Sequence, residues 1–188
     1  MLTLGEDELR SQFRIRDALG MDLVVQQAAL FARLERLGIA TRTYEHPAFF
    51  TVEEGRAYKA SMPGAHSKTL FVKDKKDNLF LIVCWADTKV ELNALSKEIA
   101  ASRVSFCSAE TMLEVLGVTP GSVTPFALIN DTGRRVQVVV DQALTHQTPN
   151  YFHPLINTKS TAIAPEDLLK FLRDLGYAPL VRAVGRAS

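Results

Sequence analysis

The sequence predicts a single domain of the mixed α/β (α+β) class, built on a curved mixed β-sheet. About six or seven strand-like and about five helix-like segments follow one another without strict alternation, which argues against a doubly wound parallel sheet. No repeat, low-complexity tract or linker divides the 188 residues. We therefore assign residues 22–188 to one domain and treat residues 1–21 as an N-terminal arm.

The first half of the domain is predicted from apolar spacing, capping residues and turn residues. Helical spacing of leucines ends at Gly38, a typical C-terminal stop. Thr51 and Glu54 have the spacing of a capping box, which predicts a helix start. The two apolar runs around the polar turn 75–78 predict a β-hairpin. The segments are helix 22–37, strand 41–44, helix 51–59, loop 61–67 and hairpin 68–85.

The second half mixes short strands with three further helices. Ser108 is a suitable N-cap for a helix that ends near Leu116, and Pro165 fits the first turn of the last helix, which Gly176 ends. The turn at 131–133 predicts a second hairpin. The segments are helix 90–100, strand 103–107, helix 108–116, hairpin strands 126–130 and 135–141, extended pair 151–157 and 160–164, and helix 166–175.

Composition narrows the classes of function. A net charge of +1 argues against a dedicated duplex-binding protein, although contact with the end of a nucleic acid remains open. No apolar run is long enough to cross a membrane, and the acidic N-terminus does not resemble a signal peptide, so we expect a cytoplasmic protein without membrane contact. Cys84 and Cys107 are expected to be reduced core thiols. A monomer is the default expectation.

The common catalytic signatures are absent from the sequence. There is no G-x-S-x-G, Walker, H-E-x-x-H or C-x-x-C motif, and the four histidines lack metal-binding spacing. We therefore expect no metal and no cofactor. Polar candidates remain: Lys68 before an apolar run, His153 between aromatics and a proline, and Asn157 with Thr158. Each also has a structural interpretation, as a solvated strand end, a satisfied histidine and a turn, respectively.

The segment Gly121-Ser122-Val123-Thr124-Pro125 is the most informative candidate. Pro125 is expected to precede a strand and to hold Thr124 in an extended conformation. Gly121 permits backbone angles that other residues avoid. Together they predict a rigid loop whose amides point outward and can hold an oxyanion or a carbonyl oxygen. The alternative interpretation is an ordinary rigid turn.

Four stretches in this order and spacing resemble one family. They are "HPAFFTVEE", "GAHSKTLFVKDKKDNLFL", "LGVTPGSVTPFAL" and "YFHPLINTKSTAIAPEDLLKFL". The sequence is similar to the YbaK-like aminoacyl-tRNA editing domains, which are related to the editing insertion of bacterial prolyl-tRNA synthetase. The family's glycine-x-x-x-proline motif falls on Gly121 to Pro125 and its lysine falls on Lys68. The similarity is greatest to the free-standing branch that removes mischarged alanine from proline tRNA.

The resemblance implies a hydrolase that cuts the ester between an amino acid and the terminal ribose of tRNA(Pro). A hydroxyl of that ribose would help to activate water, so no protein nucleophile is required. The loop amides would hold the reacting carbonyl or the ribose, and Lys68 would face the terminal phosphate or ribose. His153, Asn157 and Thr158 would line the pocket, with His153 restricting its size. Prolyl-tRNA synthetase is a further candidate partner.

Two alternatives remain open at the level of sequence. One is a deacylase that prefers another mischarged amino acid, such as cysteine or serine. The other is a module that binds tRNA or a synthetase without hydrolysing anything. Lys73, Lys75 and Lys76 form the one dense basic group, which we interpret as a solvated hairpin turn.

Overall fold

The computed structural model describes residues 22–48 and 62–185. The predicted helix at 51–59 and the N-terminal arm lie outside the described residues. The strands are β1 (Arg42–Glu45), β2 (Ala65–Lys73), β3 (Leu79–Trp85), β4 (Ser105–Phe106), β5 (Val136–Asp141), β6 (Asn150–Phe152), β7 (Lys159–Ile163) and β8 (Leu180–Arg182). The helices are α2 (Leu23–Arg36), α4 (Leu92–Glu98), α5 (Ala109–Leu116), α6 (Pro165–Asp174) and the short 3₁₀ helices η1 (Pro125–Ile129) and η2 (Gln142–His146).

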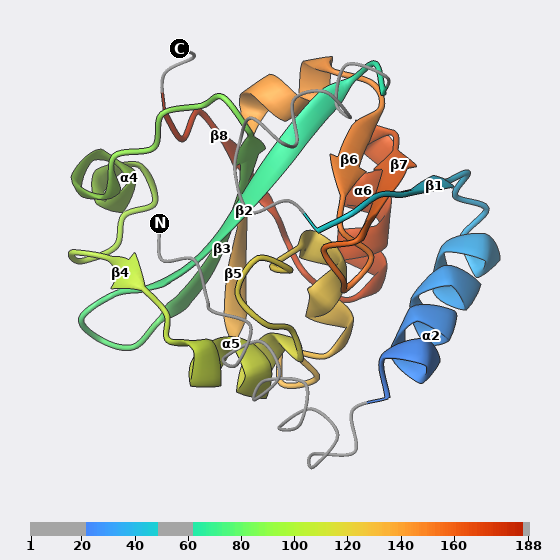
Figure 1. Cartoon of the computed structure of the whole chain (residues 1–188). Helices are drawn as coiled ribbons and strands as arrows, with labels where there is room; N and C mark the ends of the chain where they lie inside the picture. The colour runs from blue at the N-terminus through green and yellow to red at the C-terminus, as the bar shows by residue number, and fades with distance from the viewer. Residues whose placement is uncertain (1–21, 49–61, 186–188) are drawn as a thin grey trace.

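The strands form one mixed sheet in the order β1-β7-β6-β2-β3-β5-β8, and β4 pairs with β2. The predicted hairpin is present: β2 and β3 are antiparallel, with Lys68 opposite Cys84. β5 runs parallel to both β3 and β8. Figure 1 shows β2 and β3 crossing the middle of the molecule, with α4 and β4 on one side and β1, β6, β7 and α2 on the other. The mixed α/β class predicted from the sequence is therefore confirmed.

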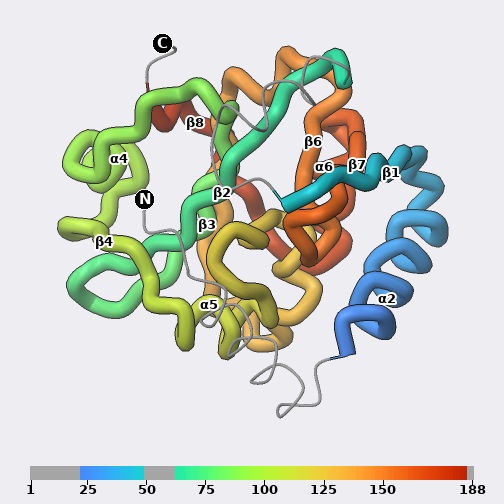
Figure 2. Tube along the Cα trace, viewed as in Figure 1, coloured from blue at the N-terminus to red at the C-terminus, as the bar shows by residue number. Residues whose placement is uncertain are grey.

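The two largest clusters of the core lie on opposite faces of the central strands, which are buried on both faces. All of β3 from Leu79 to Cys84 is buried. Leu81 and Val83 face the larger cluster, which includes the apolar faces of α2, α5 and α6. Ile82 and Cys84 face the smaller cluster, which includes Leu95 of α4. The chain trace in Figure 2 shows these helices around the sheet. Among the described residues, no helix is long and apolar enough to cross a membrane.

Local sequence signals account for the helix ends. Asp22 caps α2 through the amides of Val24 and Val25, and Ser108 caps α5 through the amide of Thr111. Gly38 and Gly176 follow α2 and α6 with φ of 65° and 89°, a backbone region that favours glycine. The predicted boundaries of these helices are therefore confirmed within one or two residues.

The predicted strand at 126–130 is wrong, and so is the hairpin that would pair it with 135–141. Pro125 begins the 3₁₀ helix η1 instead, and the hydroxyl of Thr124 accepts a hydrogen bond from the amide of Phe126 at 3.4 Å. A short buried apolar run has no period that separates strand from helix, and proline is favoured in the first helical turn. The prediction that Thr124 is extended is confirmed, with φ −155° and ψ 151°.

Two further strand predictions need correction. β2 begins at Ala65, inside the predicted loop, so Lys68 is the fourth residue of the strand and does not open it. β8 was not predicted, because Leu180–Arg182 is short and partly exposed. Eight strands are present among residues 22–48 and 62–185, one or two more than the sequence predicted.

Candidate functional site

The Gly121–Pro125 loop connects α5 to η1 with a fixed backbone. Gly121 has φ 88°, which disfavours any side chain at this position. The amide of Ser122 donates to the carbonyl of Thr119 at 3.0 Å, and the Ser122 and Thr124 side chains are buried. Within the described part of the chain, no hydrogen bond engages the amides of Gly121, Val123 or Thr124. Of these three residues, Gly121 is exposed and Val123 is half-buried, whereas Thr124 is buried, so the amides of Gly121 and Val123 are the main-chain donors nearest the surface.

A side-chain amide ties the two ends of this segment together. Asn130, which follows η1, donates from Nδ2 to the carbonyl of Leu116, the last residue of α5, at 2.8 Å. The same group lies 3.4 Å from the side-chain oxygen of Gln26 on α2. Asn130 therefore holds the loop at its base, a role that the sequence pattern did not indicate.

Asn157 lies against the loop. A Cβ atom built on Gly121 would be 3.6 Å from Asn157 Nδ2, which is ordinary van der Waals contact. Between β6 and Asn157 the chain passes through Leu155, which is fully buried and has φ 67°. Bulky residues rarely adopt this conformation, so the surrounding structure imposes it. Of the predicted site residues, Asn157 is thus brought beside the Gly121–Pro125 loop.

His153 and Thr158 lie in a cluster with His46, which the sequence analysis did not single out. His153 Nδ1 is 2.7 Å from the carbonyl oxygen of Lys159, so Nδ1 carries the proton. The carbonyl of Thr158 accepts from the His46 amide at 2.9 Å, and the rings of His46 and His153 are 6.0 Å apart. His46 Nε2 also contacts the Ser160 hydroxyl at 2.9 Å. The only sequence signal for His46 was its place in "HPAFF".

Lys68 has two main-chain partners on the turn after β3. Its ammonium donates to the carbonyl oxygens of Ala86 at 2.9 Å and of Thr88 at 2.5 Å. Thr88 is buried, and its hydroxyl donates to Asp141 at 3.1 Å. Among the described residues, no hydrogen bond or ion pair joins Lys68 to the Gly121–Pro125 loop or to His153. The interactions of Lys68 therefore belong to the region around Thr88.

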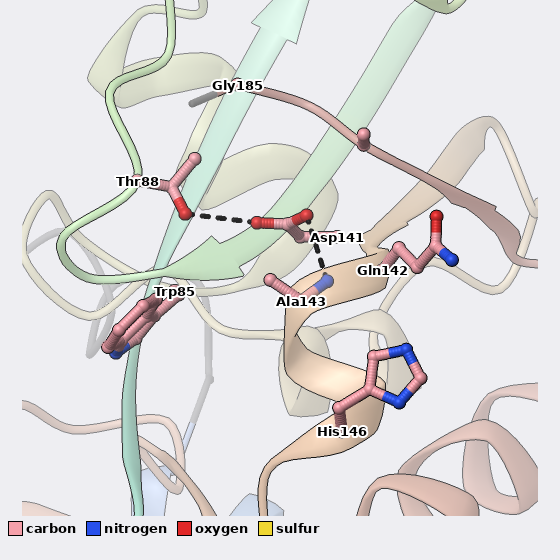
Figure 3. Close-up of a pocket in the computed structure, with 8 residues that line it drawn as sticks. Trp85, Thr88, Asp141, Gln142, Ala143, His146 and Gly185 are labelled. Atoms are coloured by element: carbon pink, nitrogen blue, oxygen red, sulfur yellow. Dashed lines mark hydrogen bonds between the residues drawn. The ribbon is translucent and has the colours of Figure 1, made fainter. Parts of the chain in front are cut away.

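A pocket of about 260 Å³ adjoins this turn. Figure 3 shows Asp141 among the residues that line the pocket. One oxygen of its carboxylate accepts a hydrogen bond from the Thr88 hydroxyl and the other accepts one from the amide of Ala143. The pocket is lined by Trp85, Thr88, Asp141, Gln142, Ala143, His146, Ala183 and Gly185. Asp141 is only 3% exposed and also caps η2. No sequence motif indicated this pocket, because its residues come from three separate strands and turns.

The two thiols are unsuited to nucleophilic catalysis. Both cysteines are free and buried, as predicted. Burial raises the pKa of Cys84 to about 12 and the pKa of Cys107 to about 11, so both remain thiols at neutral pH. In the ranges that the structure describes, no group of three or more His, Cys, Asp or Glu side chains could hold a metal ion. The loop amides, Lys68 and Asn157 carry hydrogen-bond donors, and such groups can stabilise negative charge or orient a bound molecule.

Sequence comparison places the chain in a family. Residues 46–171 match the aminoacyl-tRNA editing domain model, a range that includes Lys68, the Gly121–Pro125 loop and His153. The chain belongs to the aminoacyl-tRNA editing domain family. Among curated relatives, it is 39% identical over 150 residues to the prolyl-tRNA synthetase associated domain-containing protein 1 of Danio rerio, covering 79% of this chain and 82% of the relative.

A bacterial relative and two solved structures extend the comparison. The prolyl-tRNA editing protein ProX of Acetoanaerobium sticklandii is 31% identical over 157 residues, covering 83% of this chain and 95% of the relative. A crystal structure of a candidate trans-editing enzyme for prolyl-tRNA synthetase has a TM-score of 0.66 at 16% identity, covering 86% of this chain and 97% of the other. A hypothetical protein, APE2540, also gives 0.66, at 22% identity, with 81% and 96% covered. The two structures establish the shared fold.

Proposed function

We propose that the protein is a trans-editing deacylase that hydrolyses mischarged tRNA(Pro), with Ala-tRNA(Pro) as the preferred substrate. Water attacks the carbonyl carbon of the ester, the bond to the ribose oxygen breaks, and free amino acid and uncharged tRNA are released. The observation that carries the proposal is the rigid Gly121–Pro125 loop. Its amides at Gly121, Val123 and Thr124 have no acceptor among the described residues.

The loop amides would stabilise the negative charge that develops on the carbonyl oxygen. Main-chain donors held in advance of the reaction do this well because they need not reorganise. Gly121 and Pro125 fix the backbone, and Asn157 beside Gly121 supplies a further polar group. Removal of one such donor typically costs about 10²–10³ in rate.

Lys68 would contact the phosphate or the ribose of the terminal nucleotide. A lysine side chain is normally protonated at neutral pH, so it is better suited to binding an anion than to acting as a base. A hydroxyl of the terminal ribose would assist the attacking water. This agrees with thiols that remain protonated and with the missing nucleophile motifs.

Selection of alanine over proline would come from pocket size. Alanine has the smaller side chain, so a narrow pocket admits it and excludes the proline ring. A synthetase gains only about 1–3 kcal/mol per missing methylene when it must reject a smaller analogue. His153, whose Nδ1 donates to the carbonyl of Lys159, is the candidate to limit the space for the aminoacyl side chain, and Asn157 and Thr158 are further candidates to line that space.

A second candidate function is binding of aminoacyl-tRNA or prolyl-tRNA synthetase without hydrolysis. The ammonium of Lys68 donates to two main-chain carbonyls, as a lysine with a purely structural role would. This observation favours the binding function. The names of the relatives link such domains to prolyl-tRNA synthetase as well as to editing.

The test is release of labelled amino acid from Ala-, Pro-, Ser- and Cys-charged tRNA(Pro) by the purified full chain. We expect rapid loss of alanine with proline retained. Faster release of serine or cysteine would reassign the substrate within the same reaction. Measurable tRNA binding with no release from any substrate would favour the binding module.

A further inference from the structure

We infer that Thr88, fastened by Asp141, is a positioning residue that sets the direction of the Lys68 ammonium toward substrate. This inference rests on the proposed function, because it assigns Lys68 a substrate contact. It adds a residue that neither the sequence motifs nor the family match singles out.

The ammonium of Lys68 has three N–H donors. Two of them are used by the carbonyl oxygens of Ala86 and Thr88, at 2.9 and 2.5 Å. With two bonds fixed, the tetrahedral group has one donor left, and its direction is set by the two acceptors. A shift of either carbonyl would therefore redirect the remaining N–H.

The Thr88 carbonyl is held by contacts from a neighbouring strand. The Thr88 hydroxyl donates to Asp141 Oδ2 at 3.1 Å, and Asp141 Oδ1 accepts from the Ala143 amide at 3.2 Å. Thr88 is 2% exposed and Asp141 is 3% exposed, so water does not compete effectively for these bonds. As Figure 3 shows, the carboxylate lies between the Thr88 hydroxyl and the Ala143 amide. Asp141 therefore ties the turn after β3 to the end of β5.

The segment after β8 closes the third side of the turn. A Cβ atom on Gly185 would overlap the Lys89 carbonyl oxygen and would lie 2.8 Å from Thr88 Cγ2. Backbone thus packs directly on backbone at this point. This packing blocks movement of the turn toward the segment after β8, and the Thr88 amide donates to the Trp85 carbonyl at 3.1 Å, so the hydroxyl bond to Asp141 is the side-chain contact that completes the positioning of Thr88.

The experiment compares Thr88→Val, which removes the hydroxyl at similar volume, with Thr88→Ser, which keeps it. In Thr88→Val we expect kcat on Ala-tRNA(Pro) to fall about tenfold or more with KM little changed, because small misplacements of a reacting group can cost up to about 10²-fold. Thr88→Ser should restore most of the rate. In a Lys68→Ala background, Thr88→Val should have no further effect, because the two changes act through one group.

A second readout does not depend on activity. The rate at which acetic anhydride modifies Lys68 is measured by mass spectrometry in each variant. We expect several-fold faster modification of Lys68 in Thr88→Val and a wild-type rate in Thr88→Ser. Lys170 is the internal control, because it also donates to a main-chain carbonyl, that of Leu37, on a different part of the fold. Asp141→Asn replaces Thr88→Val if the latter does not fold, with faster labelling of Lys68 again expected.

The outcomes separate the inference from the proposed function. Wild-type kcat and wild-type labelling of Lys68 in Thr88→Val would overturn the inference. A fall in kcat that Thr88→Ser fails to restore, with labelling unchanged, would also overturn it. If the wild-type chain releases no amino acid from any tRNA, the proposed function fails, and the labelling rates alone decide whether Thr88 positions Lys68.

Discussion

The Lys68 region and the Gly121–Pro125 loop use hydrogen-bonding groups in opposite ways. Around Lys68, the carbonyls of Ala86 and Thr88 both accept from its ammonium, and Asp141 is bonded on both oxygens. In the loop, three amides have no acceptor among the described residues. The first region thus fixes a cation through two internal hydrogen bonds that leave it one N–H, whereas the second contains main-chain donors that have no acceptor within the described residues.

The difference indicates that the two regions have different roles. Internal hydrogen bonds keep a charged group in place, and main-chain donors without an internal acceptor can bind a charge that appears during a reaction. The comparison predicts that changes at Lys68 and Gly121 reduce the rate with the fold kept. Changes in contacts that only support these regions should have smaller effects on rate and measurable effects on stability.

The largest expected effect is that of Lys68→Ala. Loss of the substrate-facing donor should lower deacylation of Ala-tRNA(Pro) by about 10²–10³. Lys170→Ala is the matched control, because Lys170 also donates to a main-chain carbonyl but lies on α6. Rates are measured by release of labelled alanine, and circular dichroism checks the fold. Full activity in a folded Lys68→Ala variant would remove Lys68 from the site.

A similar effect is expected for Gly121→Ala. A side chain at φ 88° costs about 1–3 kcal/mol unless the loop shifts, and a shift would move its amides. We predict a rate loss of about 10²-fold. The control is Gly38→Ala, which has φ 65° and open space for a Cβ, so it carries comparable backbone strain away from the loop. Equal rates in the two variants would show that the loop amides do not act on substrate.

An intermediate effect is expected for Asn130→Ala, which removes the hydrogen bond between the two ends of the loop segment. Loss of the bond to the Leu116 carbonyl should cost about 1 kcal/mol of unfolding free energy. A looser loop should lower the rate about tenfold. Urea unfolding and alanine release are measured on the same preparation. A stability loss without any change in rate would show that the loop keeps its geometry without this tie.

The smallest effect concerns an ion pair that joins α2 to α6. The hydrogen bond from Arg33 lowers the pKa of Asp174, and the nearby Arg36 adds to this. Because the folded-state pKa is below the unfolded value of about 3.9, the pair stabilises the fold above that pH and loses its contribution as the pH falls further. Asp174→Asn should flatten the dependence of Tm on pH below about 4. It should leave the rate at neutral pH unchanged.

Elements with apolar residues at regular spacing over several turns, or with a clear capping or turn residue, could be predicted from the sequence. The helices α2, α5 and α6 and the β2–β3 hairpin follow from leucine spacing, Ser108, Gly38 and the turn at 75–78. The segment after Pro125 was wrongly predicted to be a strand, because a five-residue apolar run is equally compatible with a buried strand and a 3₁₀ helix. There, tertiary packing decides the conformation.

The site was only partly visible in the sequence. The loop from Gly121 to Pro125 stood out because glycine and proline have specific backbone requirements. The residues that hold Lys68 did not stand out in the sequence. Thr88, which accepts from Lys68, and Asp141, which accepts from Thr88, lie 20 and 73 residues after Lys68 and are brought together by strand pairing. His46 was missed for the same reason, because its contact with Ser160 spans 114 residues.

The most direct test of the account is deacylation of Ala-tRNA(Pro) by the wild-type chain, compared with the same substrate whose terminal ribose lacks the free hydroxyl next to the ester. The account predicts rapid alanine release from the intact substrate and a large loss of rate for the deoxy substrate, because a substrate hydroxyl assists the water. Equal hydrolysis of both would contradict substrate assistance and require a protein base. No release from the intact substrate would contradict the enzyme itself.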